Sequence, residues 1–284
     1  MTGNIKKSRK SIITARVVDH HEVVKNHFLM TLKVPIDFQT AVPGQFVMIR
    51  VKGRDEPFLH RPFSINFLTS HGTETLIGIL YKVIGKGTTI FSRLKKDEEL
   101  YVMGPLGSGF TVPSDRKKVA LVAGGMGIAP LSFLAEYLKR QTSFSEQGIE
   151  EVVCYLGAST SQLLLDRERL ENTCSKLMIS TDDGSDGYHG TVTELFQNHV
   201  DAYADSDSIV FCCGPDPMMA GIADIVKKYF IPCQVSMEER MACGVGACLG
   251  CVVRAKSHGD QQHYMTVCKD GPVFDIRDII WRQE

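Results

Sequence analysis

Short apolar and alternating segments, separated by turn residues, fill the first third of the chain. Turn signals stand between them, as at Pro43-Gly44 and at Ser70-His71-Gly72. Strands at this spacing, without a helical pattern between them, are typical of a small antiparallel barrel. The expected strands are Ile12–Val18, Phe28–Val34, Gln45–Val51, Ser64–Leu68, Thr75–Val83 and Glu99–Met103. One short helix is expected at Thr88–Leu94, after a glycine loop.

From Lys117 the pattern changes to continuous apolar runs that alternate with amphipathic segments. Continuous runs are typical of parallel strands that are buried on both faces. Repeated strand–helix units predict a parallel sheet covered by helices, in which ligands bind at the carboxyl ends of the strands. The expected strands are Lys118–Ala123, Glu151–Leu156, Lys176–Ser180, Ser208–Cys213 and Cys233–Met237. The expected helices are one that ends near Lys139, then Ser161–Glu171, Val192–His199 and Pro217–Tyr229.

The last part of the chain holds a group of cysteines in C-x4-C-x2-C spacing, followed after sixteen residues by a fourth. They are Cys243, Cys248, Cys251 and Cys268. This is the plant-type ferredoxin arrangement, which predicts a [2Fe–2S] centre held by four thiolates. Glycines between the thiols let the backbone wrap tightly, so that backbone N–H groups can point at the sulfurs.

Three other interpretations of these cysteines compete with an iron–sulfur centre. Structural zinc is usually bound by two C-x2-4-C pairs, and the second pair is missing here. Disulfides are disfavoured because nine cysteines without an export signal indicate a reducing compartment. Free thiols could also pack as small apolar groups.

Length and pattern together predict three parts within 284 residues. They are an antiparallel β-barrel at 11–115, a parallel-sheet α/β nucleotide-binding domain at 116–238 and a small C-terminal cluster-binding domain at 239–284. The net charge of −1 gives no case for nucleic acid or an anionic membrane as the main partner. The basic run Lys6–Lys10 lacks the apolar segment of a secretory signal, and no run reaches the roughly 18–20 residues of a membrane span. We expect a cytoplasmic protein.

Two groups of residues in the barrel could bind an anionic cofactor. In Arg61-Pro62-Phe63-Ser64 a guanidinium could bind a diphosphate and a nearby hydroxyl could reach a ring nitrogen. Leu80-Tyr81-Lys82 is followed by the glycine loop Gly85–Thr89, whose N–H groups could bind an anion. Taken singly, the first is more often a strand end and the second a turn.

Two loops of the α/β part are candidates for binding a nucleotide. Gly124–Pro130 links a strand to a helix, which is the geometry that places a diphosphate at a helix N-terminus. It reads G-G-x-G, so the usual G-x-G-x-x-G fingerprint is absent. The second loop is Cys213–Met218, where the Cys213 thiol could approach a cofactor ring or simply pack.

In their order along the chain, these motifs resemble the ferredoxin–NADP⁺ reductase superfamily. More narrowly, they resemble the electron-transfer subunits of class 1B dihydroorotate dehydrogenase (the PyrK family). The resemblance implies an FAD site at Arg61, Pro62, Phe63, Ser64, Leu80, Tyr81, Lys82, Gly87 and Thr88. It implies a nicotinamide nucleotide site at Gly124, Gly125, Gly127, Cys213, Gly214, Pro215 and Met218. It also implies [2Fe–2S] ligation by Cys243, Cys248, Cys251 and Cys268.

The resemblance further implies a partner catalytic subunit that carries FMN and oxidises dihydroorotate, in a heterotetramer with two copies of each chain. Since a nicotinamide exchanges hydride and a cluster exchanges single electrons, FAD is expected between them. Asp182 and Asp183 would repel a 2′-phosphate, so NAD is expected rather than NADP. An apolar, weakly charged face around Met241–Leu249 is expected to be buried against the partner.

No arrangement of acid–base catalytic residues is evident, and the nine histidines are expected at the surface. Two other functions remain open. The chain could belong to a sulfhydrogenase-like or NADH-dependent ferredoxin–NADP⁺ oxidoreductase complex, or it could be a non-enzymatic redox sensor.

Overall fold

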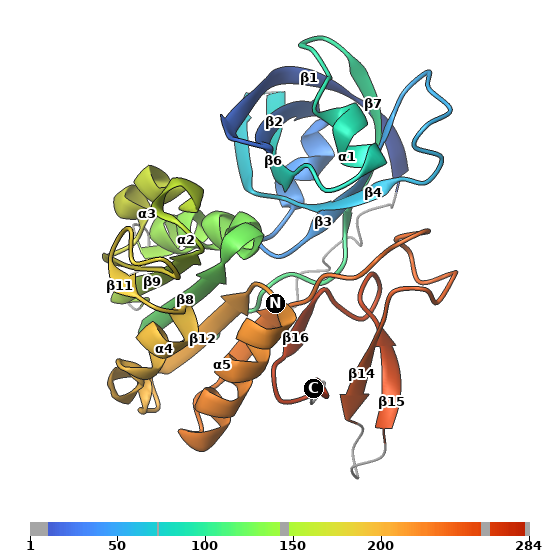
Figure 1. The fold of residues 1–284 in the computed structure, drawn as a ribbon. Coiled ribbons are helices and arrows are strands. Elements are labelled where there is room, and N and C mark those ends of the chain that lie inside the picture. The colour runs from blue at the N-terminus through green and yellow to red at the C-terminus, as the bar shows by residue number, and fades with distance from the viewer. Residues whose placement is uncertain (1–10, 73, 143–147, 257–261, 282–284) are drawn as a thin grey trace.

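The computed structural model describes residues 11–72, 74–142, 148–256 and 262–281. The basic run Lys6–Lys10 lies outside these residues. Figure 1 shows a curled antiparallel sheet at one end, a helix-covered parallel sheet beside it, and a C-terminal segment that contacts both. In the described residues no helix is long and apolar enough to cross a membrane.

The first sheet contains seven strands in the order β4-β3-β7-β1-β2-β6-β5, and all neighbouring pairs are antiparallel. Alternate side chains point into one apolar core, which also receives Phe91 from the short helix α1. The predicted antiparallel barrel is therefore confirmed in outline. The elements are β1 (Ser11–Val24), β2 (His27–Val34), β3 (Phe46–Val51), β4 (Arg61–Ser64), β5 (Phe67–His71), β6 (Glu74–Lys82), α1 (Lys86–Phe91) and β7 (Glu99–Leu106), with a 3₁₀ turn η1 (Ile36–Thr40).

The prediction of one strand at Ser64–Leu68 is wrong, because the chain changes its pairing partner inside that range. β4 pairs with β3, whereas β5 pairs with β6 at the opposite edge of the sheet. The Ile65 N–H still donates to the Gln45 carbonyl at 3.1 Å, and the next N–H, that of Asn66, donates to the Gly78 carbonyl at 2.8 Å. The Ile65–Asn66 step therefore links the two edges and curls the sheet.

The second sheet has the order β11-β10-β9-β8-β12-β13-β16, parallel except for the β13–β16 pair. The order reverses between β8 and β12, so the loops that follow these two strands are neighbours. Helices α2 and α3 cover one face, and α4 and α5 cover the other. The elements are β8 (Lys118–Gly124), η2 (Gly125–Gly127), α2 (Ile128–Thr142), β9 (Glu151–Ala158), β10 (Lys176–Thr181), β11 (Tyr188–His189), α4 (Val192–Gln197), η4 (Val200–Tyr203), β12 (Ser208–Cys213), α5 (Asp216–Lys228) and β13 (Cys233–Ser236).

The prediction of one helix at Ser161–Glu171 is also wrong. The segment contains a 3₁₀ turn, η3 (Ser161–Leu163), and then helix α3 (Arg167–Thr173). Asp166, just before α3, has a φ of 55°, in the left-handed region that interrupts a helix. Its carboxylate accepts hydrogen bonds from Asn66 and Ser132, so tertiary contacts override the local helical pattern.

The C-terminal segment was not resolved into elements by the sequence pattern. It forms a hairpin of β14 (Val252–Lys256) and β15 (Gln262–Thr266), and then β16 (Val273–Asp275). β16 extends the second sheet by pairing antiparallel to β13. The cysteine-rich segment is thus attached at both ends to the edge of the nucleotide sheet, and the boundary expected near residue 238 stays a prediction.

Candidate functional site

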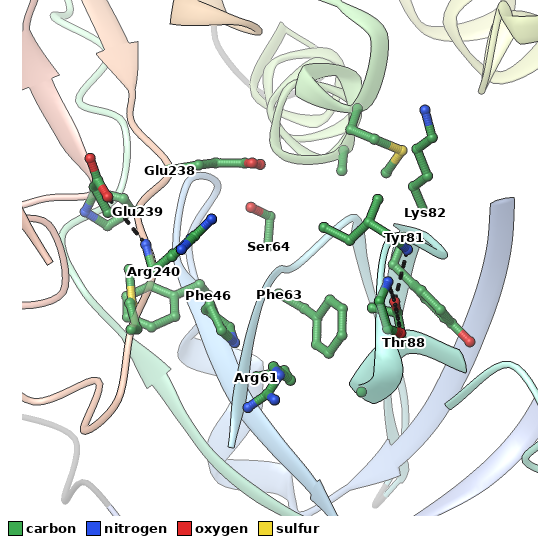
Figure 2. Close-up of a pocket in the computed structure, with 18 of the residues that line it drawn as sticks. Phe46, Arg61, Phe63, Ser64, Tyr81, Lys82, Thr88, Glu238, Glu239 and Arg240 are labelled. Carbon is green, nitrogen blue, oxygen red and sulfur yellow. Dashed lines mark hydrogen bonds between the residues drawn. The ribbon is translucent and has the colours of Figure 1, made fainter. Parts of the chain in front are cut away.

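A cleft of about 900 Å³ opens where the barrel, the nucleotide sheet and the C-terminal segment meet. The nine residues predicted to bind FAD all line it, as Figure 2 shows for most of them. The α/β part contributes Met126, Ala129 and Asp216. The C-terminal segment contributes the run 237–241 and Pro272. The site is therefore built from all three parts of the chain.

Arg61 lies at the start of β4, directly beside the glycine loop before α1. Its Nη1 donates to the Leu59 carbonyl at 2.9 Å, which orients the guanidinium. A Cβ on Gly87 would lie 2.9 Å from Arg61 Nε, so only glycine leaves room for this arrangement. The Thr88 hydroxyl accepts from the N–H groups of Ile84 (2.9 Å) and Gly85 (3.2 Å). Thr88 thus shapes the loop rather than offering a free hydroxyl to a ligand.

An aromatic cluster supports the floor of the cleft behind β4. The Tyr81 ring lies 5.5 Å from the Phe63 ring and 5.7 Å from the Phe28 ring. Tyr81 is only 2% exposed, and burial raises the pKa of its hydroxyl. His20 Nδ1 lies 2.8 Å from the Leu94 carbonyl, so Nδ1 carries the proton and Nε2 accepts from the Tyr81 hydroxyl at 3.0 Å. Tyr81 therefore contributes its ring to the wall and not its hydroxyl.

The expectation that every histidine lies at the surface is wrong for His27, which is buried, and His20 is half-buried beneath the cleft. His20 belongs to the polar second half of β1, which the apolar pattern placed outside the strand. Only the alternation across Asp19–Glu22 could have indicated that the strand continues.

Glu238 is a cleft residue that the sequence motifs did not indicate. In Figure 2 its side chain extends across the cleft near Ser64. The carboxylate is open to solvent at the mouth of the cleft but is otherwise surrounded by protein. This loss of solvation raises the pKa of Glu238, and the nearby Asp216 carboxylate raises it further. Its place just beyond the carboxyl end of β13 is where ligands of such sheets bind, and that position was the available signal.

The two predicted nucleotide loops are in close contact at the point where the strand order reverses. A Cβ on Gly127 would lie 2.1 Å from the Cys213 carbonyl oxygen, and one on Gly124 would lie 2.4 Å from Met218 Sδ. Gly125 has a φ of 52° and no neighbour that would meet a Cβ, so the loop is open on that side. The seven predicted residues of these loops are Gly124, Gly125, Gly127, Cys213, Gly214, Pro215 and Met218, and they lie beside the cleft rather than in its lining.

Cys213 is packed in the core of the sheet. It is 2% exposed, and burial raises the pKa of its thiol well above the ordinary value, with a further contribution from Glu238. The thiol is therefore neutral. Of the two roles considered for Cys213, the packing role describes its contacts.

Backbone N–H groups surround the sulfurs of the cysteine loop, as the glycine content predicted. The Cys243 sulfur accepts from the N–H groups of Val245 (3.4 Å), Ala247 (3.3 Å) and Cys248 (3.4 Å). The Cys268 sulfur accepts from Gly246 at 3.1 Å. Gly244 and Gly246 have φ values of 69° and 82°, which turn these amides inward.

Such donors stabilise thiolates. Burial raises the pKa of Cys243, but the N–H donors of Val245, Cys248 and Ala247, with the Cys248 side chain, outweigh burial and lower it to about 6. Among the described residues, no group of three His, Cys, Asp or Glu is placed to hold a single metal ion. Four thiols, three of which accept backbone N–H groups at their sulfurs, are nevertheless a donor set suited to an iron–sulfur cluster, so these residues fit the group.

The thiols differ in their access to solvent. Cys251 and Cys268 are 1% exposed and belong to a core that also includes Met48 and Leu106 of the barrel. Cys248 is exposed, next to Leu249, which is 67% exposed. A Cβ on Gly244 would lie 2.5 Å from Met48 Cγ. The cysteine loop thus packs against barrel strand β3 on one side and faces solvent on the other.

Comparisons with known proteins agree with this layout. A sequence profile described as the iron–sulfur cluster binding domain of dihydroorotate dehydrogenase B matches residues 238–280. A profile described as an oxidoreductase NAD-binding domain matches residues 121–224. The chain is 38% identical over 270 residues to the dihydroorotate dehydrogenase B (NAD(+)) electron transfer subunit of Desulforamulus reducens, covering 95% of this chain and 98% of that one. The same subunit of Clostridium acetobutylicum is 39% identical over 238 residues, 84% of this chain and 86% of that one.

Two solved structures show how far the fold is shared. The NADH-dependent reduced ferredoxin-NADP oxidoreductase matches with a TM-score of 0.79 and 28% identity, over 99% of this chain and 92% of that one. A ferredoxin NADP+ reductase from Neisseria gonorrhoeae with bound FAD and NADP matches with a TM-score of 0.62 and 14% identity, over 77% and 91%. The second likeness concerns the fold alone.

The barrel, the nucleotide sheet and the cysteine-rich segment together define an NAD-dependent flavin and iron–sulfur oxidoreductase subunit with a ferredoxin reductase-like fold. Within that class, the chain belongs to the family of dihydroorotate dehydrogenase B (NAD(+)) electron transfer subunits.

Replacing Gly244 by Ala is expected to reduce the iron content of the purified protein. The substitution forces an L-residue to a φ of 69°, which costs about 1–2 kcal/mol, and drives its Cβ into the fully buried Met48. Gly250→Ala is the matched control, because its Cβ would meet only Cys248 Sγ at 3.6 Å. Iron and acid-labile sulfide per chain measure the effect, and equal values for the two variants would contradict it.

Glu238→Gln is expected to stabilise the protein increasingly as the pH rises. A carboxyl whose pKa is raised on folding adds stability below its ordinary pKa and loses it as the pH rises through the raised value, so ionised Glu238 is unfavourable. The difference in apparent Tm between variant and wild type should therefore widen as the pH rises above the ordinary pKa of a glutamate carboxyl. Glu239→Gln removes the neighbouring charge as a control. A difference that does not change with pH would count against the burial argument.

Proposed function

We propose that this chain connects a catalytic subunit that oxidises dihydroorotate with NAD⁺, using FAD in the cleft and a [2Fe–2S] cluster at the four cysteines. One observation carries the proposal. The single segment 237–243 first lines the cleft, then ends at Cys243, whose sulfur accepts three backbone N–H groups. The proposed flavin site and the proposed cluster site would thereby share one short chain segment.

The three groups would supply complementary chemistry, since nicotinamide exchanges hydride, a cluster exchanges single electrons and a flavin does both. The chain's own part is to bind and orient them. Arg61, Lys82 and Arg240 line the cleft. None of them forms an ion pair with another of the described residues, so their charges are available to an anionic ligand. Ser64 would donate or accept at the flavin edge, and the Glu238 side chain lies near it across the cleft.

NAD would occupy the loops at the reversal of strand order, with Gly125 leaving the approach open. Asp182 and Asp183 lie exposed just beyond β10. The Ser185 hydroxyl and N–H donate to the Asp183 carboxylate at 2.6 and 3.0 Å and lower the pKa of that carboxyl, so it stays charged. The nearby Arg167 is engaged by Glu171 and Asp186. This charge pattern favours NAD over a nucleotide with a 2′-phosphate.

The exposed side of the cysteine loop, Ala247–Gly250, would face the FMN-containing subunit. It carries no charged side chain and presents Leu249, so it can be covered without burying an unpaired charge. By the relatives' names the partner would be a dihydroorotate dehydrogenase, and we propose two copies of each chain in the cytoplasm.

A second candidate function follows from the similarity to the NADH-dependent reduced ferredoxin-NADP oxidoreductase, which spans nearly the whole of both chains. In that case the exposed cysteine face would meet a different redox subunit. The higher identity to the dihydroorotate dehydrogenase subunits favours the first function.

The purified chain is expected to show flavin absorbance together with cluster absorbance and about two irons.

Arg61→Met should weaken flavin retention about tenfold or more, because it removes a charge-assisted hydrogen bond of roughly 1.5–3 kcal/mol, while leaving the iron content unchanged. Arg54→Met is the matched control, because Arg54 lies outside the cleft and pairs with Glu98 at 3.0 Å. A colourless protein, or one that carries zinc, would sink the proposal.

The two candidate functions differ in what the assembled complex oxidises. With a co-purified FMN subunit from the same cell, dihydroorotate is expected to reduce NAD⁺ only when this chain is present. Cys268→Ser should abolish that activity, because it removes one of the four thiolates proposed to hold the cluster. NADH-dependent reduction of NADP⁺ with reduced ferredoxin, and no reaction with dihydroorotate, would support the second candidate instead.

A further inference from the structure

A partly buried hydrogen-bond network joins the barrel to the nucleotide sheet, away from the cysteines. Its centre is Asn66, which is 0% exposed. Asn66 Nδ2 donates to Asp166 Oδ2 at 2.8 Å, and Asn66 Oδ1 accepts from Arg169 Nη1 at 2.8 Å. The Asn66 backbone carbonyl accepts from Arg169 Nη2 at 3.0 Å. One guanidinium therefore binds both carbonyl groups of a single asparagine.

The charges of this network are matched within the protein. Asp166 Oδ2 also accepts from the Ser132 hydroxyl at 2.6 Å, and Arg169 Nε donates to Glu136 Oε1 at 2.7 Å. The Arg169 guanidinium lies over the Phe67 ring, 5.5 Å from its centroid. Side chains from the two helices α2 and α3 thus bind the short barrel segment that follows β4.

The backbone at Asp166 indicates that this arrangement is strongly determined. An aspartate with a φ of 55° costs free energy locally, and such conformations persist where the surroundings fix them. Asp166 precedes α3 but its side chain does not cap the helix. Its carboxylate instead lies between Asn66 and Ser132.

The network lies between the two halves of the redox site. Asn66 follows Ser64 by two residues, and Ser64 lines the cleft. Asn66 Nδ2 also lies 3.3 Å from the carbonyl of Ala129, which lines the cleft and stands just after the loop Gly124–Gly127. The same contacts therefore fix the strand end of the barrel relative to the start of α2.

The barrel and the α/β part also pack against each other through apolar side chains, independently of this network. Phe133 of α2 is already inserted into the apolar core of the barrel and is 3% exposed. Apolar burial is not directional, whereas the bidentate Arg169–Asn66 contact and the Asp166 carboxylate allow one relative orientation. The polar contacts are thus suited to setting orientation rather than supplying adhesion.

We propose that Asn66, Asp166 and Arg169 are positioning residues that set the orientation of the nucleotide loops to the flavin cleft, and thereby the rate of hydride transfer. The inference rests on the proposed function, because it assumes FAD in the cleft and NAD at the loops. Hydride transfer requires reacting atoms about 3–3.5 Å apart, and a displacement of about 1 Å can reduce the rate about 100-fold. None of the three residues lines the cleft.

The test is rapid-mixing reduction of the flavin in the intact purified protein by NADH, analysed as a limiting rate and a half-saturating NADH concentration. Arg169→Met is expected to lower the limiting rate about 10- to 100-fold, with flavin and iron contents unchanged and the half-saturating concentration changed less than about twofold. Arg54→Met is the matched control, because Arg54 is exposed, lies outside the cleft and pairs with Glu98 at 3.0 Å. It should keep the wild-type rate.

Asp166→Asn provides a second variant of nearly the same shape, in case Arg169→Met does not fold. It is expected to lower the limiting rate in the same direction. Wild-type limiting rates in both variants, or a loss confined to thermal stability or flavin content, would overturn the inference. If NADH does not reduce the wild-type flavin, the proposed function fails. Hydrogen exchange then tests the network separately. Faster exchange at 64–68 and 128–136 is expected in Arg169→Met but not in Arg54→Met, and equal exchange in the two variants would count against the network.

Discussion

Six residues separate the last parallel strand, β13, from the first cysteine of the C-terminal loop. A chain segment of this length spans at most about 25 Å even when fully extended. Its side chains line the cleft along the way, so the wall of the cleft and the anchor of the cysteine loop are one piece of backbone. Neither can be displaced far without the other, because this tether bounds the separation between the wall of the cleft and Cys243.

Packing reinforces the tether from both sides. β16 returns to pair with β13, so the cysteine-rich segment is closed at the edge of the nucleotide sheet. The buried thiols Cys251 and Cys268 then share one apolar core with Met48 and Leu106 of the barrel. Gly244 permits this contact, since any side chain there would collide with Met48. The barrel, the sheet and the cysteine loop thus meet through specific contacts rather than through flexible linkers.

The sequence predicted most of the fold because its signals were local. The apolar runs indicated the parallel strands, and Arg61–Ser64 with Gly87–Thr88 reached the same cleft as expected. Cysteine spacing and glycine content predicted the N–H groups around the sulfurs.

The failures share a different physical cause, because each depends on a contact between distant parts of the chain. The Ser64–Leu68 strand divides because Ile65 and Asn66 pair with opposite edges of the sheet. The Ser161–Glu171 helix divides because Asp166 is held by Asn66 and Ser132. Glu238 belongs to no motif, and its raised pKa arises from loss of solvation and from the Asp216 carboxylate, which comes from another part of the chain. Local sequence patterns carry no information about such long-range contacts.

The four thiols differ in burial, and this difference determines how readily each of them can be oxidised. Cys251 and Cys268 are shielded by apolar side chains, whereas Cys248 stands at the surface beside Leu249. Oxidants and chelators reach thiolates according to their accessibility. A subunit seated on Ala247–Gly250 would therefore act as a shield as well as an electron donor. The assembled complex would then resist air oxidation, whereas this chain without its partner would lose its cluster more readily in air.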